Sequence, residues 1–319
     1  MVAVFIAGAT GKQGGGTART LLSMGHQVHA YVRDTEAPSA RSLAQQGAKL
    51  FQGDWESLPA IRAAVKGCAA VFFPSMPSFT DPAAEERWAA NILSAARDSG
   101  SVKHVVYSTS AVLERFDKIK AVEGWDDNAF MAQYFWSKNA GEKAVRDWAR
   151  VGEGLKYTIL RPSGFMSNWL EPVASFQIPD LISEGVWHTV FPPDFPIAQI
   201  APGDIGRVAA LAIENPEKWH GKEAELTTER MPVKEVLELL SEFSGKDLKP
   251  HSYTKEEGEE VAKVNPIIKG GVLTMKTQPA DGPVVGDLDV PFRPQTFREY
   301  LEENKSVVVE TYKNVAARA

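Results

Sequence analysis

Cysteine is nearly absent from this chain of 319 residues, which has Cys68 and no other. A single thiol excludes an internal disulfide and a cysteine-based zinc cluster. The neighbouring run Ala69-Ala70-Val71-Phe72-Phe73 is apolar, so Cys68 is predicted to pack as a small core residue at the start of a strand. Scarce cysteine is also typical of proteins from reducing compartments.

Basic residues and long apolar runs are scarce as well. Lys and Arg number 35 against 41 Asp and Glu, a formal net charge of −6, whereas a broad nucleic-acid surface needs a basic balance. No apolar run approaches the roughly 18 residues of a membrane-spanning helix, and the N-terminus lacks the basic segment of a secretory signal. We therefore expect a cytoplasmic protein that contacts neither nucleic acid nor membrane directly.

Several catalytic motifs are missing. The six histidines are scattered along the chain, so no metal site is predicted. Neither H-E-x-x-H nor G-x-S-x-G occurs, which leaves zinc-peptidase and serine-hydrolase chemistry without support.

The first residues predict a strand, a glycine-rich turn and a helix. The apolar run at 2–6 ends at Gly8, and Gly8, Gly11 and Gly14 have the spacing G-x-x-G-x-x-G, a variant of the dinucleotide fingerprint. Glycines there permit a tight turn, approach of the backbone to a pyrophosphate, and close helix–strand packing. The helix N-terminus offers N–H groups to phosphates. An ordinary strand-to-helix turn is the alternative, and an ATP-type loop fits poorly because Gln13 follows Gly11-Lys12.

The second predicted strand, 27–32, ends at Arg33-Asp34, where a dinucleotide fold contacts the adenosine ribose. An acidic residue at this position binds the 2′-hydroxyl of NAD, whereas an arginine accommodates the 2′-phosphate of NADP. Arg33 therefore favours NADP over NAD. A solvated charge at a strand end is the alternative.

The third predicted strand, 49–53, is followed by Asp54 and Trp55, where an adenine ring would lie. The carboxylate can accept from the adenine amino group, and the indole can cover the ring. Alternatively, Asp54 is a helix N-cap, because another helix is predicted from Leu58.

The rest of the chain predicts more strands alternating with helices. Strands are expected at 69–73, 105–107, 157–160 and 225–227, and helices at 40–47, 86–99, 133–151, 205–213 and 233–243. This rhythm predicts an α/β protein with a Rossmann-type, doubly wound parallel sheet. We expect that domain to comprise 1–162 and 201–230, and a smaller α/β substrate domain to comprise 163–200 and 231–319. Gly270-Gly271 and 279–283 are predicted loops.

A candidate catalytic group consists of Ser110, Tyr134 and Lys138. The Y-x-x-x-K spacing places Tyr134 and Lys138 on one helix face. A tyrosine with an ordinary pKa near 10 is a poor acid at neutral pH, but a neighbouring ammonium favours the phenolate. Tyr134 would then protonate a substrate oxygen, Ser110 would hydrogen-bond the carbonyl, and Lys138 would contact the nicotinamide ribose. A core tyrosine beside a solvated lysine is the alternative.

The motif Gly8-Ala9-Thr10-Gly11-Lys12-Gln13-Gly14 resembles the G-A-T-G-x-Q-G of the NmrA-like proteins, atypical members of the short-chain dehydrogenase/reductase superfamily. The resemblance continues through 32–34, 53–54, 106–108, 160–169, 203–206 and 296–301. It implies an NADP-preferring Rossmann domain with a smaller C-terminal domain. The cofactor contacts that it implies are Thr10, Gly11, Lys12, Gln13, Gly14, Gly15, Arg33, Asp54, Trp55, Ser75, Met76, Pro77, Lys138, and the turn Gly164-Phe165.

The resemblance leaves two functions open. Some NmrA-like proteins are redox sensors that bind NADP(H) and regulate a protein partner, often without the catalytic tyrosine. Others reduce quinones, enones or metabolic intermediates. Because this sequence keeps Tyr134 together with Lys138, we expect an NADP(H)-dependent oxidoreductase of a small organic carbonyl, quinone or activated double bond.

Overall fold

A computed structural model describes residues 1–78, 80–81, 83–278, 285 and 288–318. The chain forms two compact units: Met1–Leu113, Gln133–Arg161 and Pro202–Glu225 make up the first, and Glu114–Ala132, Pro162–Ala201 and Leu226–Ala319 the second. Residues 114–132 were predicted to belong to the first unit. The structure places them in the second, because helix α5 (Phe116–Lys120) packs on helix α13 (Pro266–Thr277).

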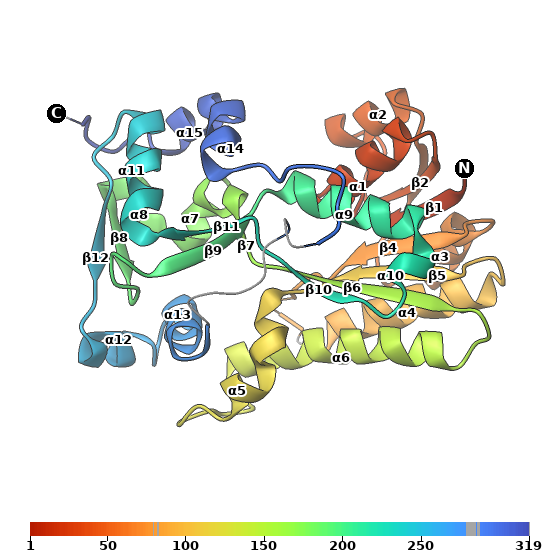
Figure 1. Cartoon of the computed structure of the whole chain (residues 1–319), viewed down its shortest axis with the longest axis horizontal. Helices are drawn as coiled ribbons and strands as arrows, with labels where there is room; N and C mark the ends of the chain where they lie inside the picture. The colour runs from red at the N-terminus through yellow and green to blue at the C-terminus, as the bar shows by residue number, and fades with distance from the viewer. Residues whose placement is uncertain (79, 82, 279–284, 286–287, 319) are drawn as a thin grey trace. The chain divides into compact units, whose positions relative to one another are not determined.

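The first unit is built around a seven-stranded sheet in the order β10-β6-β5-β4-β1-β2-β3 (Figure 1). Neighbouring strands from β3 to β6 pair in parallel. The strands are β1 (Ala3–Ala7), β2 (Gln27–Val32), β3 (Lys49–Gln52), β4 (Ala70–Pro74), β5 (His104–Ser108), β6 (Lys156–Pro162) and β10 (Glu223–Leu226). The order reverses between β1 and β4, and the predicted doubly wound Rossmann-type fold is confirmed.

Helices cover both faces of this sheet. Helices α3, α4 and α6 pack on one face, where Phe5, Val71 and Val105 belong to a single buried cluster. Helices α1 and α9 pack against each other on the other face (Figure 1). The helices are α1 (Lys12–Ser23), α2 (Pro38–Gln45), α3 (Leu58–Val65), α4 (Ala84–Asp98), α6 (Phe130–Arg150), α9 (Pro202–Glu214) and α10 (Pro216–Trp219), and a short 3₁₀ helix, η1, spans Ala111–Arg115.

Strand β4 shows why the central strands form where they do. Its sequence, Ala-Val-Phe-Phe-Pro, is apolar throughout and every residue in it is buried. A parallel strand covered by helices on both faces needs such an uninterrupted run. Cys68 is buried just before β4, as predicted, and burial raises the pKa of its thiol to about 12.

The second unit contains two small sheets around its own core. One has the order β11-β9-β7, and the other is the parallel pair β12-β8. Its core includes Trp169, Leu237, Phe297 and Tyr312, and the Tyr312 hydroxyl donates a 2.7 Å hydrogen bond to the carbonyl of Trp169. Its remaining elements are β7 (Gly164–Phe165), η2 (Met166–Trp169), α7 (Ala174–Gln177), α8 (Pro179–Glu184), β8 (Val186–Thr189), β9 (Pro196–Ile200), β11 (Glu229–Pro232), α11 (Val233–Ser244), β12 (Lys249–Ser252), α12 (Lys255–Val261), α14 (Phe297–Glu303) and α15 (Lys305–Thr311).

Two local predictions for this unit were wrong. Gly270-Gly271 is not a loop but lies inside α13, where a side chain at Gly271 would begin 2.9 Å from Val190. Gly164-Phe165 is not a turn but the short strand β7, which pairs with β9. The predicted loop at 279–283 lies outside the described residues.

Across the described ranges, no helix is both long and apolar enough to cross a membrane. In the same ranges, no group of three or more His, Cys, Asp and Glu side chains is placed to hold a metal ion.

Candidate functional site

The glycine-rich loop between β1 and α1 has a shape that side chains would destroy. Gly8 has φ +62°, a left-handed conformation that favours glycine. A Cβ at Gly14 would lie 2.3 Å from the carbonyl oxygen of Gly8, so the first turn of α1 approaches the strand end too closely for any side chain. The loop is therefore a compact cradle of backbone atoms.

The N-terminus of α1 has no side-chain cap. Its N-cap is Gly11, which supplies no side-chain cap, and its first turn holds no acidic residue. Thr10, Gly11 and Lys12 are exposed. A helix start that has exposed residues, no side-chain cap and a partial positive charge has the chemistry of a phosphate site.

The loop lies where a doubly wound sheet binds ligands. A Cβ at Gly8 would lie 3.5 Å from the indole of Trp55 and 3.8 Å from Pro74, the last residue of β4. The predicted residues Ser75, Met76 and Pro77 follow directly, and Met76 is exposed. The structure thus brings the loop, Trp55 and the end of β4 together at the point where the strand order reverses.

Arg33 and Asp54 are exposed where β2 and β3 end. The prediction of Asp54 as a helix N-cap was wrong, because the N-cap of α3 is Ser57. One oxygen of the Asp54 carboxylate instead accepts hydrogen bonds from the N–H groups of Glu56 and Ser57, at 3.0 and 2.9 Å. The turn that leads into α3 is fixed in this way, and Trp55 is held beside it by a bond from Asn91 to its carbonyl.

Lys138 is buried, and its ammonium has two partners in the first unit. Its Nζ donates to the hydroxyl of Ser75 at 2.7 Å and to the carboxylate of Glu85 at 3.1 Å. The side chains of Lys138 and Glu85 are 2% and 4% exposed. Glu85 lies in α4, and no spacing in the sequence links it to Lys138.

Tyr134 and Lys138 lie together on α6, as the Y-x-x-x-K spacing predicts. The ammonium of Lys138 lies 4.5 Å from the centroid of the Tyr134 ring, a cation–π contact. Among the described residues the Tyr134 hydroxyl has no hydrogen-bond partner, and the residue is half-buried. Ser110 follows β5, and its hydroxyl is 3.5 Å from the N–H of Val112.

A hydrogen bond that the sequence did not predict joins the first turn of α1 to β5. The buried hydroxyl of Ser108 donates to the side-chain oxygen of Gln13 at 2.6 Å, and the Ser108 carbonyl accepts from the N–H of Ser75 at 2.7 Å. Ser108 therefore fixes the Gln13 amide in the first turn of α1 and the backbone of Ser75, the residue that contacts Lys138.

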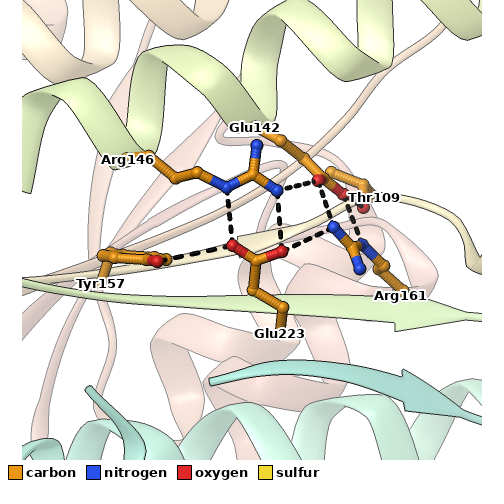
Figure 2. Close-up of polar contacts among 6 residues, drawn as sticks. All are labelled: Thr109, Glu142, Arg146, Tyr157, Arg161 and Glu223. Carbon is orange, nitrogen blue, oxygen red and sulfur yellow. Dashed lines mark hydrogen bonds and ion pairs between the residues drawn. The ribbon is translucent and has the colours of Figure 1, made fainter. Parts of the chain in front are cut away.

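A network of charged side chains that the sequence did not predict anchors α6 one turn after Lys138 (Figure 2). Glu142 is 1% exposed and accepts from Thr109 and from the guanidinium groups of Arg146 and Arg161. Both arginines also reach Glu223 at 2.7 Å, and the bonds from Arg146 hold the pKa of Glu223 below its ordinary value. This network of two carboxylates and two guanidiniums ties α6 to β6 and β10.

The other two predicted coenzyme contacts, Gly164 and Phe165, lie in strand β7 of the second unit. Gly164 is exposed and Phe165 is half-buried.

Comparisons with known proteins agree with this fold. The family model described as the NmrA-like family matches residues 2–272. An NmrA-like family domain-containing oxidoreductase, notA, of an Aspergillus species is 38% identical over 112 residues, 33% of each protein. Protein TIC 62 of Oryza sativa, a chloroplastic protein, is 30% identical over 184 residues, which are 50% of this chain and 35% of that protein. The chain thus matches about a third of the length of these relatives.

Two solved structures share the fold over almost the whole chain. NmrA, a negative transcriptional regulator in complex with NAD, is 18% identical with a TM-score of 0.70 and covers 98% of both chains. The NADPH-dependent quinone oxidoreductase QOR2 of Escherichia coli, complexed with NADPH, is 21% identical with a TM-score of 0.68 and covers 95% of this chain and 99% of that one.

Proposed function

From the premise that this chain belongs to the NmrA-like family, we propose that it binds NADP(H) at the glycine-rich loop and reduces a small carbonyl, quinone or activated alkene. The observation that carries the proposal is the cradle in which a side chain at Gly14 would meet the Gly8 carbonyl. Such a loop in front of an uncapped helix lets a diphosphate approach main-chain N–H groups.

Residues from Thr10 to Gly15 would hold the diphosphate, with Asp54 and Trp55 beside the adenine and Ser75, Met76 and Pro77 along the end of β4. Arg33 is exposed at the end of β2 and would pair with a 2′-phosphate, which distinguishes NADP from NAD. Gly164 and Phe165 complete the proposed contacts.

The bound coenzyme would supply a hydride to the substrate. The Tyr134 hydroxyl, which has no partner in the described part of the chain, would donate a proton to the substrate oxygen. Ser110 would hydrogen-bond the same oxygen, and Lys138 would hold a ribose hydroxyl. A small organic substrate and a cytoplasmic location are parts of the same proposal.

One observation favours the second function, a non-catalytic NADP(H) sensor that acts through a protein partner. Glu85 neutralises the charge of Lys138 at 3.1 Å, so less positive field reaches the neighbouring tyrosine than an unpaired lysine would provide. A sensor needs different affinities for NADP⁺ and NADPH, because a ligand shifts an equilibrium only through differential binding.

Two measurements separate these functions. First, calorimetric titration with NADP⁺, NADPH and NADH tests coenzyme binding, and absence of binding by all three contradicts both functions. Second, NADPH oxidation is followed with a panel of quinones and enones. For the enzyme we expect turnover that falls by roughly 10²-fold or more in Tyr134→Phe with unchanged NADPH affinity. Unequal affinities without any turnover favour the sensor, and full activity in Tyr134→Phe rules out the proposed acid.

A further inference from the structure

The second unit contains a cavity of about 110 Å³, and no residue of the predicted coenzyme set is among those that line it. Its lining includes the buried apolar side chains of Ile178, Leu181, Val190 and Ile268. These residues come from α8, the ends of β8 and α13, and the segment before α8. The cavity therefore has an apolar floor built from several parts of one unit.

Aromatic rings form the rest of its wall. Trp187, His188, Phe191 and Tyr253 all line the cavity. The rings of Trp187 and Phe191 lie 6.0 Å apart, and those of His188 and Tyr253 lie 5.9 Å apart, with centroid distances typical of interacting aromatic pairs.

Three polar groups on this wall make no hydrogen bond to any described residue. Among the residues that the structure describes, neither the His188 imidazole, the Trp187 indole N–H nor the Tyr253 hydroxyl has a hydrogen-bond partner. The backbone around them is fixed, since the N–H of Tyr253 donates to the carbonyl of Thr189 at 2.8 Å. An apolar cavity with a few polar groups left for a ligand is the usual form of a small-molecule site.

The charge of the lining restricts the ligand. No Lys or Arg is among the described residues that line the cavity, and its one carboxylate, Asp180, is exposed. A carboxylate or phosphate would have no cation to pair with there. The site is suited to a neutral molecule.

The volume restricts the ligand further. An engineered apolar cavity of about 150 Å³ binds benzene, so a cavity of about 110 Å³ limits the ligand to no more than a single ring. We propose that this cavity binds a neutral molecule with one aromatic ring and a hydroxyl group, of which phenol is the simplest. The ring would pack against the apolar floor and the aromatic wall, and the hydroxyl would hydrogen-bond His188 or Tyr253. This proposal does not depend on coenzyme binding.

The test is titration of the full chain with phenol, followed by calorimetry and by ligand-detected NMR. We expect saturable binding at one site with a Kd on the order of 1 mM. Cyclohexanol has a similar size but no aromatic ring, and benzoate adds a charge, so each is expected to bind about tenfold more weakly or worse. Absence of saturable phenol binding, or equal binding of cyclohexanol, would overturn the proposal.

Variants locate the site. Ile268→Phe fills the floor and should abolish phenol binding, while at least one of His188→Ala and Tyr253→Phe should weaken it by about fivefold. His220→Ala, a histidine of the first unit outside the cavity lining, is the matched control and should bind as the wild type does. If Ile268→Phe does not fold, the other two variants decide the matter, because unchanged binding in both contradicts the proposal.

Discussion

The ammonium of Lys138 lies 3.1 Å from the carboxylate of Glu85, and neither side chain is more than 4% exposed. Ser137 also donates to this carboxylate, at 3.1 Å. Removing one member of a buried ion pair leaves an uncompensated charge in the protein interior. The pair therefore couples α4 to the face of α6 that carries Tyr134.

We expect Glu85→Gln to lower the free energy of unfolding by about 3 kcal/mol, because it preserves the shape and removes the counter-charge. Adding Lys138→Met should restore much of that loss, since it removes the ammonium that Glu85→Gln leaves buried without a counter-charge. Urea denaturation of the single and double variants measures both effects. As a control, Asp98→Asn removes the exposed partner of Arg62 and should cost about 1 kcal/mol or less. If the losses of the two single variants simply add in the double variant, the ion pair is not the cause.

Much of the first unit could be predicted from the sequence, because its signals are local. An apolar run such as Ala70–Pro74 specifies a buried strand by itself, and glycine spacing specifies the loop after β1. The partners of the site residues are not local: Gln13 and Ser108 lie 95 positions apart, and Lys138 and Glu85 lie 53 apart. Their side chains meet only because the parallel strands, and the helices that pack on them, bring distant segments together.

The second unit was harder to predict for a related reason. Gly270-Gly271 suggests a loop because glycine disfavours helices, by about 1 kcal/mol relative to alanine. In the structure Gly271 is required by packing, since α13 approaches Val190 too closely for a Cβ. A tertiary contact therefore overrides the local preference, and no pattern around 270–271 shows it.

Arg33→Ala is expected to weaken NADPH binding by about tenfold to a hundredfold while changing NADH affinity by about twofold or less. The guanidinium at the end of β2 would lose its charge-assisted bonds to a 2′-phosphate, which NADH lacks. Calorimetric titration with both coenzymes measures the ratio. Arg97→Ala, an exposed arginine in the last turn of α4, should leave both affinities unchanged. Parallel loss of NADH and NADPH binding in Arg33→Ala would argue against a role in coenzyme selection.

Gly206→Ala should destabilise the first unit by about 2 kcal/mol or more, because its Cβ would lie 2.4 Å from the backbone carbon of Gly16 and 2.5 Å from the Thr17 nitrogen. Backbone atoms cannot rotate away, so α9 and α1 must separate. Gly203→Ala is the matched control on the same helix: its Cβ meets nothing within 4 Å, and it should be neutral or stabilising by up to about 1 kcal/mol. Urea denaturation compares the two, and equal stability of both variants contradicts the packing argument.

Because of the buried imidazole of His104, we expect the folded protein to lose stability in mild acid. It is 2% exposed, and burial lowers its pKa to about 4. The Thr158 hydroxyl donates to the carbonyl of Trp219, so it accepts from Nε2–H of His104 at 2.9 Å, and the ring is neutral. Because the folded pKa lies below the ordinary value of about 6.5, the unfolded chain binds more protons between these values. The contribution of His104 is complete above about pH 6.5 and is lost as the pH falls toward 4.

At about pH 5 the loss attributable to His104 is about 2 kcal/mol relative to pH 7. His104→Gln does not titrate, so its stability should fall by about 2 kcal/mol less than that of the wild type over this range, although the variant is less stable at neutral pH. Urea denaturation at the two pH values, followed by tryptophan fluorescence, measures the difference. His251→Gln changes an exposed histidine of the second unit, which does not act on the pKa of His104, and should keep the wild-type pH dependence. If His104→Gln loses as much stability in acid as the wild type does, the buried neutral ring is not the source of the acid sensitivity.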